Sequence, residues 1–294
     1  MMPGIMKKYQ SIGELLIDYR KVNQLSQADF AASINVDTRT IQRWENGSTL
    51  IKPEKEESIV VETLLPYQLI RNLNASKPIP TYYDFHIRKY SLTKLANKLP
   101  KASWFKANID MATNRIRQLE YEKDIDDLVR YMSLHKKISR SLKAVIKESI
   151  KLVPELNLII FDDSGYYSGH TLVFPINKEA YVRLRNREMT EQDLEVKDLV
   201  DYRNVDKPIF FSLDITADCN DNMYFIVGQM FRFIRDELND NYLFCSIPFR
   251  YDNFDLIEEI GLHIVWEDKR HKNAFGLEIA SRFQEGNFKK MLME

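Results

Sequence analysis

The stretch Asp37-Thr-Arg-Thr-Ile-Gln-Arg-Trp-Glu-Asn-Gly47 decides how the first part of this chain folds. Asp37 is a favourable N-cap, and Asn46-Gly47 supplies a helix stop. Ile41 and Trp44 recur at the spacing of one buried helix face. The pattern therefore predicts a short helix whose opposite face carries donors suited to base edges and phosphates: Thr38, Arg39, Gln42 and Arg43. An ordinary amphipathic helix with a solvated polar face is the alternative that these residues leave open.

The residues on either side predict further helices. Residues 11–24 carry a helical stripe of apolar side chains, namely Ile12, Leu15, Leu16, Tyr19 and Val22. Ser26 opens a second helix, with Asp29 at the place where a capping box requires an acid. A tight turn joins this helix to the one after Asp37, which is the arrangement of a helix-turn-helix. Residues 54–65 predict a fourth helix that closes the bundle through Ile59, Val60, Leu64 and Leu65.

This order of residues resembles the phage-repressor and Cro family of XRE-type helix-turn-helix domains from residue 8 to about 66. The Leu25-Ser26-Gln27 opening and the Arg43-Trp44-Glu45-Asn46-Gly47 close carry the match. The resemblance implies a helical bundle whose third helix enters the major groove of double-stranded DNA, and a homodimer on two-fold sites. It places Arg20 and Glu45 in a structural salt bridge. By position, it implies that Gln27 and Asn46 hold the phosphate backbone while base edges are faced by Thr38, Arg39 and Arg43, with Gln42 close by.

Composition bounds the class of protein. A chain of 294 residues suits two domains, and 44% hydrophobic with 12% aromatic residues is enough for real cores. The two cysteines, Cys219 and Cys245, indicate neither a disulfide framework nor a zinc cluster. No apolar run reaches membrane-spanning length, and the N-terminus lacks the apolar core of a signal peptide. We therefore expect a soluble cytoplasmic protein that binds no membrane and no metal.

Charge is segregated along the chain although its net value is only -1. Residues 67–109 hold eight Lys or Arg against one acid, Asp84, and are interrupted by Pro78, Pro80 and Pro100. This composition predicts a basic linker over 67–109, between a helix-turn-helix domain at 1–66 and a further domain at 110–294. Its positive charge either strengthens DNA binding non-specifically or simply neutralises the acidic remainder of the chain.

From residue 110 onward, strands and helices alternate. The patterns predict a strand near 116–120, helices 124–135 and 141–152, a hairpin 156–161 and 166–176, strand 208–217, helix 223–238, strand 242–249, helix 253–260, and strands 262–267 and 274–280. This order resembles the GNAT acyltransferase superfamily, and Phe254-Asp-Leu-Ile-Glu-Glu-Ile-Gly-Leu262 is similar to its Leu-Tyr-Glu-Lys-Leu-Gly-Phe signature. The expected fold class is thus multi-domain: an all-α helix-turn-helix bundle followed by an α/β GNAT-like mixed-sheet domain.

The second domain departs from the resemblance where chemistry is needed. GNAT enzymes hold the pyrophosphate of coenzyme A on a glycine-rich loop at a helix N-terminus. The corresponding segment, Asp218-Cys-Asn-Asp-Asn-Met223, has no glycine and carries two carboxylates that repel a pyrophosphate. The position of the proton-donating tyrosine falls at Ile257, which has no proton to give. We expect no catalytic residue and no cofactor, with coenzyme A or acetyl-CoA as the alternative.

The sequence therefore predicts a sequence-specific, DNA-binding transcriptional regulator. Its GNAT-like domain would sense a small-molecule effector or support dimerisation rather than catalyse a reaction. Two alternatives remain open: a DNA-tethered, acyl-CoA-dependent N-acyltransferase, and a protein-interaction module built on residues 1–66.

Overall fold

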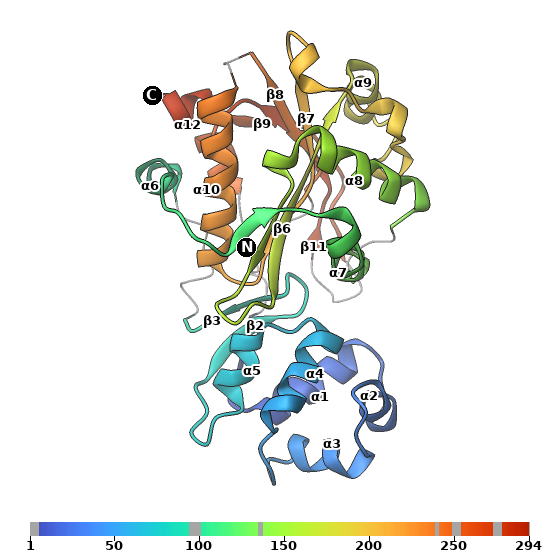
Figure 1. Ribbon diagram of the computed structural model, residues 1–294, viewed down its shortest axis with the longest axis vertical. Coiled ribbons are helices and arrows are strands. Elements are labelled where there is room, and N and C mark those ends of the chain that lie inside the picture. The colour runs from blue at the N-terminus through green and yellow to red at the C-terminus, as the bar shows by residue number, and fades with distance from the viewer. Residues whose placement is uncertain are drawn as a thin grey trace. The chain divides into compact units, whose positions relative to one another are not determined.

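The computed structural model describes residues 6–93, 101–134, 138–238, 241–248, 254–272 and 278–293 (Figure 1). The chain divides into two compact units. The N-terminal unit comprises residues 1–98 together with 161–168 and 218–220, and the C-terminal unit comprises residues 99–160, 169–217 and 221–294. Each unit has a hydrophobic core of its own.

Five helices build the N-terminal unit in its described part: α1 (Ile12–Val22), α2 (Gln27–Ser33), α3 (Thr38–Glu45), α4 (Pro53–Thr63) and α5 (Tyr67–Leu73). The capping box at the start of α2 is present, because Ser26 accepts from the Asp29 N–H and the Asp29 carboxylate accepts from the Ser26 N–H. Pro53 begins α4, and Leu64 ends it in the left-handed conformation at a φ of 53°. The four helices predicted from local sequence signals are confirmed.

The apolar stripes of these helices meet in one core. Leu15, Leu16 and Ile59 are fully buried. Tyr19 of α1 packs against Phe30 of α2 with their ring centroids 5.5 Å apart. A bundle of short helices gains most of its stability from such burial, because helices of this length are marginal in isolation. The core therefore fixes α3 against α1 and α2.

Residues 67–91 are folded into the N-terminal unit, which differs from the linker that the composition predicts. Helix α5 buries Leu69 and Ile70 in the helix-turn-helix core. A three-stranded antiparallel sheet follows in the order β1 (Lys7–Tyr9), β2 (Thr81–Asp84) and β3 (Lys89–Ser91). Strands of three or four residues are too short to show an alternation in the sequence, and β1 pairs with a strand more than seventy residues away. For both reasons the sheet could not be predicted from the sequence.

The positive charge of this segment is only partly solvated. Lys89 and Arg88 are buried, and the Arg88 guanidinium donates to the backbone carbonyl of Thr63. Arg71 pairs with Glu56 at 2.8 Å. Lys94 and Lys98 lie outside the described residues. A diffuse interaction of the whole segment with DNA is therefore not supported, because several of its cations already have partners inside the unit.

A seven-stranded mixed sheet organises the second part of the chain. Its order is β4 (Ile116–Gln118), β5 (Leu158–Phe161), β6 (Tyr167–Ile176), β7 (Ile209–Ala217), β8 (Leu243–Ser246), β12 (Arg282–Gly286) and β9 (Leu262–Glu267). Strands β7 and β8 are parallel and pair over Ile209–Ser212 and Leu243–Ser246. The β6–β7 register shifts between Leu172 and Val173, so that Leu213 is an extra residue in β7. Strands β10 (His271–Lys272) and β11 (Glu278–Ile279) form a separate pair.

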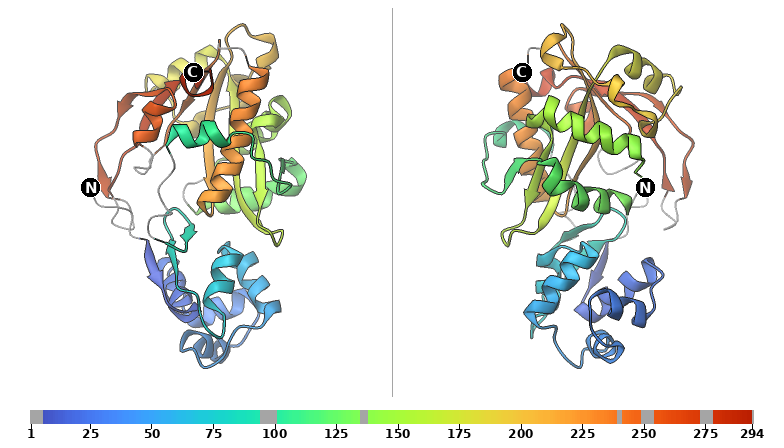
Figure 2. Two further views of the ribbon diagram at one scale, coloured as in Figure 1. Left: turned by 90° about the vertical axis from the view of Figure 1, so that its left-hand side faces the viewer. Right: turned by 45° about the vertical axis from the view of Figure 1, so that its right-hand side comes forward.

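Helices cover both faces of this sheet. Helices α7 (Tyr121–Ser133) and α8 (Arg140–Leu152) lie over one face, and the long helix α10 (Asn220–Glu237) lies over the other (Figure 2). The remaining helices are α6 (Ala102–Asn108), α9 (Lys178–Arg185), α11 (Phe254–Glu259) and α12 (Lys289–Met293), with 3-10 turns at 154–156, 191–193, 196–198 and 202–204. The predicted fold class, a helical bundle followed by an α/β mixed-sheet domain, is confirmed.

Two parts of this domain differ from the sequence analysis. The polar stretch 177–205 contains α9 and three 3-10 turns, although its composition gave no clear period. The strand of the large sheet that comes last in the chain is β12, which sequence analysis did not predict. Arg282 and Glu285 are buried in it, so its sequence lacks the apolar pattern of a strand. Residues 274–277 of the strand predicted at 274–280 lie outside the described residues, as do residues 135, 249 and 253 at the ends of other predicted elements.

Candidate nucleic-acid interface

Helix α3 begins at a well-formed cap. One Asp37 carboxylate oxygen accepts from the Thr40 N–H at 2.8 Å, and the other accepts from the Thr40 hydroxyl at 3.0 Å. The Thr40 N–H bond is the main cause that lowers the pKa of Asp37. The Asp37 carboxylate therefore stays charged at neutral pH and interacts favourably with the positive end of the helix dipole. In the preceding turn, Asn35 adopts a positive φ of 53°, which reverses the chain between α2 and α3.

The two faces of α3 differ as the sequence predicts. Ile41 and Trp44 are buried in the core, whereas Arg39, Gln42 and Arg43 are exposed. Thr38, at the first turn, is partly exposed. The two arginines are four residues apart and so lie one above the other on the same side of the helix. This surface offers guanidinium and amide donors to a partner outside the unit.

Glu45, at the end of α3, ties three helices together. Its carboxylate accepts from the Arg20 guanidinium through Nε at 2.5 Å and Nη2 at 2.9 Å, and from Gln27 Nε2 at 2.7 Å. Arg20 also donates to the carbonyl of Leu25 at 3.1 Å. The predicted salt bridge between Arg20 and Glu45 is confirmed as a two-point contact. It fixes the angle at which α3 is presented, because it connects α1, the first turn of α2 and the last turn of α3.

Gln27 and Asn46, predicted to hold phosphates, also have partners within the unit. Gln27 donates to Glu45, and its carbonyl oxygen accepts from Gln42 Nε2 at 3.3 Å. The Asn46 side-chain oxygen accepts from the Ser48 N–H at 2.9 Å and closes the turn after α3. Sequence reasoning could not find these bonds, because they depend on how the helices are packed. The phosphate-binding role of both residues stays a prediction.

The basic side chains of the N-terminal unit fall into two groups. Most have a partner, as in the pairs of Lys7 with Asp18 and Arg71 with Glu56. Within the described part of the chain, the cations that form no side-chain hydrogen bond, ion pair or ring contact with a described residue are Arg39, Arg43, Lys52 and Lys77. Sequence analysis assigned the two arginines to DNA, counted Lys77 only as one cation of the basic segment 67–109, and did not single out Lys52.

Asp218, at the start of the segment compared above with a pyrophosphate loop, is already hydrogen-bonded within the N-terminal unit. The Asp218 N–H donates to the Ser168 carbonyl at 2.8 Å, and the Asp218 carboxylate accepts from the Ser168 hydroxyl at 3.0 Å. The Asp218 carbonyl accepts from the Tyr90 N–H at 2.8 Å. The Asp218 N–H is thus occupied, and the carboxylates of Asp218 and Asp221 disfavour an anion at this place.

Other candidate chemistry is weak where the structure describes it. Ile257 is buried in an apolar cluster, and burial raises the pKa of the Cys245 thiol. No group of three or more His, Cys, Asp or Glu side chains with metal-binding geometry occurs among the described residues. Within the same residues, no helix is both long and apolar enough to cross a membrane.

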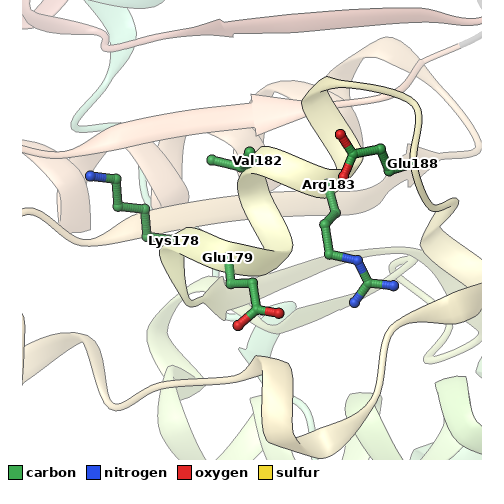
Figure 3. A pocket seen from close by; sticks show the side chains of 5 residues that line it. All are labelled: Lys178, Glu179, Val182, Arg183 and Glu188. Atoms are coloured by element: carbon green, nitrogen blue, oxygen red, sulfur yellow. The ribbon is translucent and has the colours of Figure 1, made fainter.

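The C-terminal unit has an open depression beside α9 (Figure 3). It is lined by Lys178, Glu179, Val182, Arg183 and Glu188. Figure 3 shows the side chains of Lys178 and Arg183 extending in different directions from the helix. A small ligand needs convergent polar groups in a concave site, and this mixed, divergent set does not supply them. The depression therefore does not identify an effector.

Comparison with known proteins finds one family model that matches a short part of the chain. Residues 16–55 match a family model described as Helix-turn-helix. No curated protein matches the chain. Solved structures with similarity include a Drosophila melanogaster polyamine N-acetyltransferase, with 9% identity over 58% of this chain and 98% of that chain at a TM-score of 0.40. An Aedes aegypti arylalkylamine N-acetyltransferase 2 has 10% identity over 60% of this chain and 100% of that chain at a TM-score of 0.37. A Brucella melitensis ribosomal-protein-alanine N-acetyltransferase has 9% identity over 58% of this chain and 98% of that chain at a TM-score of 0.34.

Proposed function

We propose that this protein is a cytoplasmic transcriptional regulator that reads double-stranded DNA through α3. The observation that carries the proposal is the exposed face of α3, where Arg39 and Arg43 have no partner among the described residues. An α-helix fits the major groove of DNA. Because the two arginines have no intramolecular partner among the described residues, they can bind phosphates and base acceptors without breaking an existing contact. The helix-turn-helix match at residues 16–55 supports the same function.

Each residue of the interface has a proposed role. Arg39 and Arg43 reach guanine, which a guanidinium binds through two acceptors, and each such pair contributes about 1–3 kcal/mol of discrimination. Thr38 faces a neighbouring base edge, with Gln42 close by. Gln27 and Asn46 contact the phosphate backbone and set the register of α3.

We further propose that the protein binds DNA as a homodimer. One helix-turn-helix reads only a few base pairs, and two copies related by a two-fold axis read two half-sites about one helical turn apart. The mixed-sheet domain then supports the dimer or binds a small-molecule effector that changes DNA affinity.

Selection of bound duplexes from random DNA tests this function. We expect an enriched, two-fold symmetric motif whose half-site centres are separated by about 34–36 Å along the helix axis or a multiple of that spacing. Sequencing of the pool after successive rounds gives the measurement. A folded protein that enriches no motif contradicts the proposal and favours the protein-interaction alternative for residues 1–66.

The mixed-sheet domain is proposed to be non-catalytic. The segment Asp218–Met223 has no glycine, its Asp218 N–H is occupied, and it carries two carboxylates, which repel an anion. We expect isothermal titration calorimetry with millimolar coenzyme A or acetyl-CoA to give no saturable heat. The same protein preparation must bind its selected DNA, which shows that the sample is active. Saturable binding of coenzyme A at micromolar concentration contradicts this proposal and supports the DNA-tethered acyltransferase.

A further inference from the structure

The loop between α5 and β2 is built tightly although its tip is exposed. The Ile79 N–H donates to the Asn72 carbonyl at 2.7 Å and closes the loop at its base. The buried Asn74 side chain exchanges two hydrogen bonds with the backbone of Ile51, accepting at 2.9 Å and donating at 2.8 Å. It also donates to Glu56 Oε1 at 2.5 Å. These bonds hold the loop against the segment that joins α3 to α4.

This anchoring determines where the tip of the loop lies. The segment joined to Asn74 begins directly after α3, and within the N-terminal unit the loop and α3 extend towards the same end, whereas β2 and β3 lie at the other end (Figure 1). Ser76, Lys77 and Pro78 form the exposed tip. Because proline restricts the backbone, Lys77 is presented on a loop that has little conformational freedom to lose on binding.

Two lysines at this place, Lys52 and Lys77, are exposed. Lys77, and Lys52 at the start of α4, form no hydrogen bond, ion pair or ring contact with a described residue. The nearby carboxylate of Glu56 is buried and already paired with Arg71 and Asn74. By contrast, Lys8 on β1 is exposed but lies over the ring of Tyr82, with Nζ 5.7 Å from its centroid. The unpaired cations of the unit therefore gather around α3 and the segments attached to it.

We propose that the loop of residues 74–79 is a second DNA contact, in which Lys77, supported by Lys52, binds backbone phosphates beside the groove that α3 enters. The proposal rests on the function proposed above and extends it beyond the matched residues 16–55. An ammonium group on a fixed loop neutralises a phosphate without reading sequence, so the contact adds affinity and orientation but no base preference.

The salt dependence of binding to the duplex selected by the wild-type protein tests this contact. Each neutralised phosphate contributes about 0.9 to the slope of log K against log salt concentration. We expect Lys77→Ala to reduce the slope by about that amount for each bound protomer and to weaken binding at least three- to tenfold near physiological salt, with the selected motif unchanged. Lys77→Arg should retain the slope. Lys8→Ala, which removes an exposed lysine at the other end of the unit, should match the wild type.

A phosphate-by-phosphate map gives an independent readout. In duplexes carrying one neutral methylphosphonate at a time, we expect one outer position in each half-site to weaken wild-type binding but to have no effect on Lys77→Ala. An unchanged slope and an unchanged map for Lys77→Ala, with the variant melting at the wild-type temperature, overturn the proposal. If the wild-type protein selects no duplex at all, it is the proposed function that fails rather than the role of this loop alone.

Discussion

Replacing Glu45 by alanine is expected to lower the free energy of unfolding of the N-terminal unit by about 3–5 kcal/mol. The Glu45 side chain is only 7% exposed and that of Arg20 only 15%, so removal of the carboxylate leaves a largely buried guanidinium without its counter-charge. Gln27 loses its acceptor at the same time. Hydrogen exchange of the amides in α1–α3, compared between variant and wild type in the full chain, measures the loss of protection.

The matched control for this change is Glu62→Ala. Glu62 is exposed on α4, and its replacement removes the same charge without opening a buried network. We expect it to change stability by less than about 0.5 kcal/mol. A Glu45→Ala variant as stable as Glu62→Ala would show that the three-helix network does not hold α3 in place.

Replacing Trp44 by alanine is expected to destabilise the N-terminal unit by about 3–5 kcal/mol and to abolish binding to the selected DNA. Trp44 is only 4% exposed and, with Ile41, forms the buried face of α3. Loss of the indole leaves a cavity beneath the helix, so the exposed arginines lose their fixed position. Denaturant unfolding followed by far-ultraviolet circular dichroism, together with DNA titration, measures both effects.

Arg39→Ala separates recognition from stability on the same helix. Arg39 is exposed and has no partner among the described residues, so its removal should leave the unfolding transition unchanged while it alters DNA binding. If Trp44→Ala retained wild-type stability, the assignment of Trp44 as the anchor of α3 would be wrong.

The helix-turn-helix was readable from sequence because its signals are local. The capping box at Ser26 and Asp29, the Asp37 cap and the spacing of Ile41 and Trp44 each act within a few residues. The fold around it was not readable in the same way. Strand β1 pairs with β2 across most of the unit, and Asn74 recognises the backbone of Ile51. Such contacts produce no periodic pattern in the sequence, because they depend on tertiary packing.

The residues of the candidate site likewise fall into those that local sequence predicts and those that only the tertiary structure reveals. Arg39, Gln42 and Arg43 were predicted because helical spacing alone places them opposite the buried face of α3. Lys77 was counted only as one cation of the basic segment 67–109, since an exposed lysine becomes informative only when the partners of its neighbours are known. Strand β12 could not be predicted for a related reason. Arg282 and Glu285 are buried in it, and charged residues in a sequence do not indicate a buried strand.

The most direct measurement of the central claim is a paired selection from random DNA with the wild-type protein and Arg39→Ala. We expect the wild type to enrich a two-fold motif, and Arg39→Ala to enrich the same motif except for one symmetry-related base pair in each half-site, where the preference is lost. An absent wild-type motif, or an Arg39→Ala motif identical to that of the wild type at every position, would contradict the claim that α3 reads DNA through this residue.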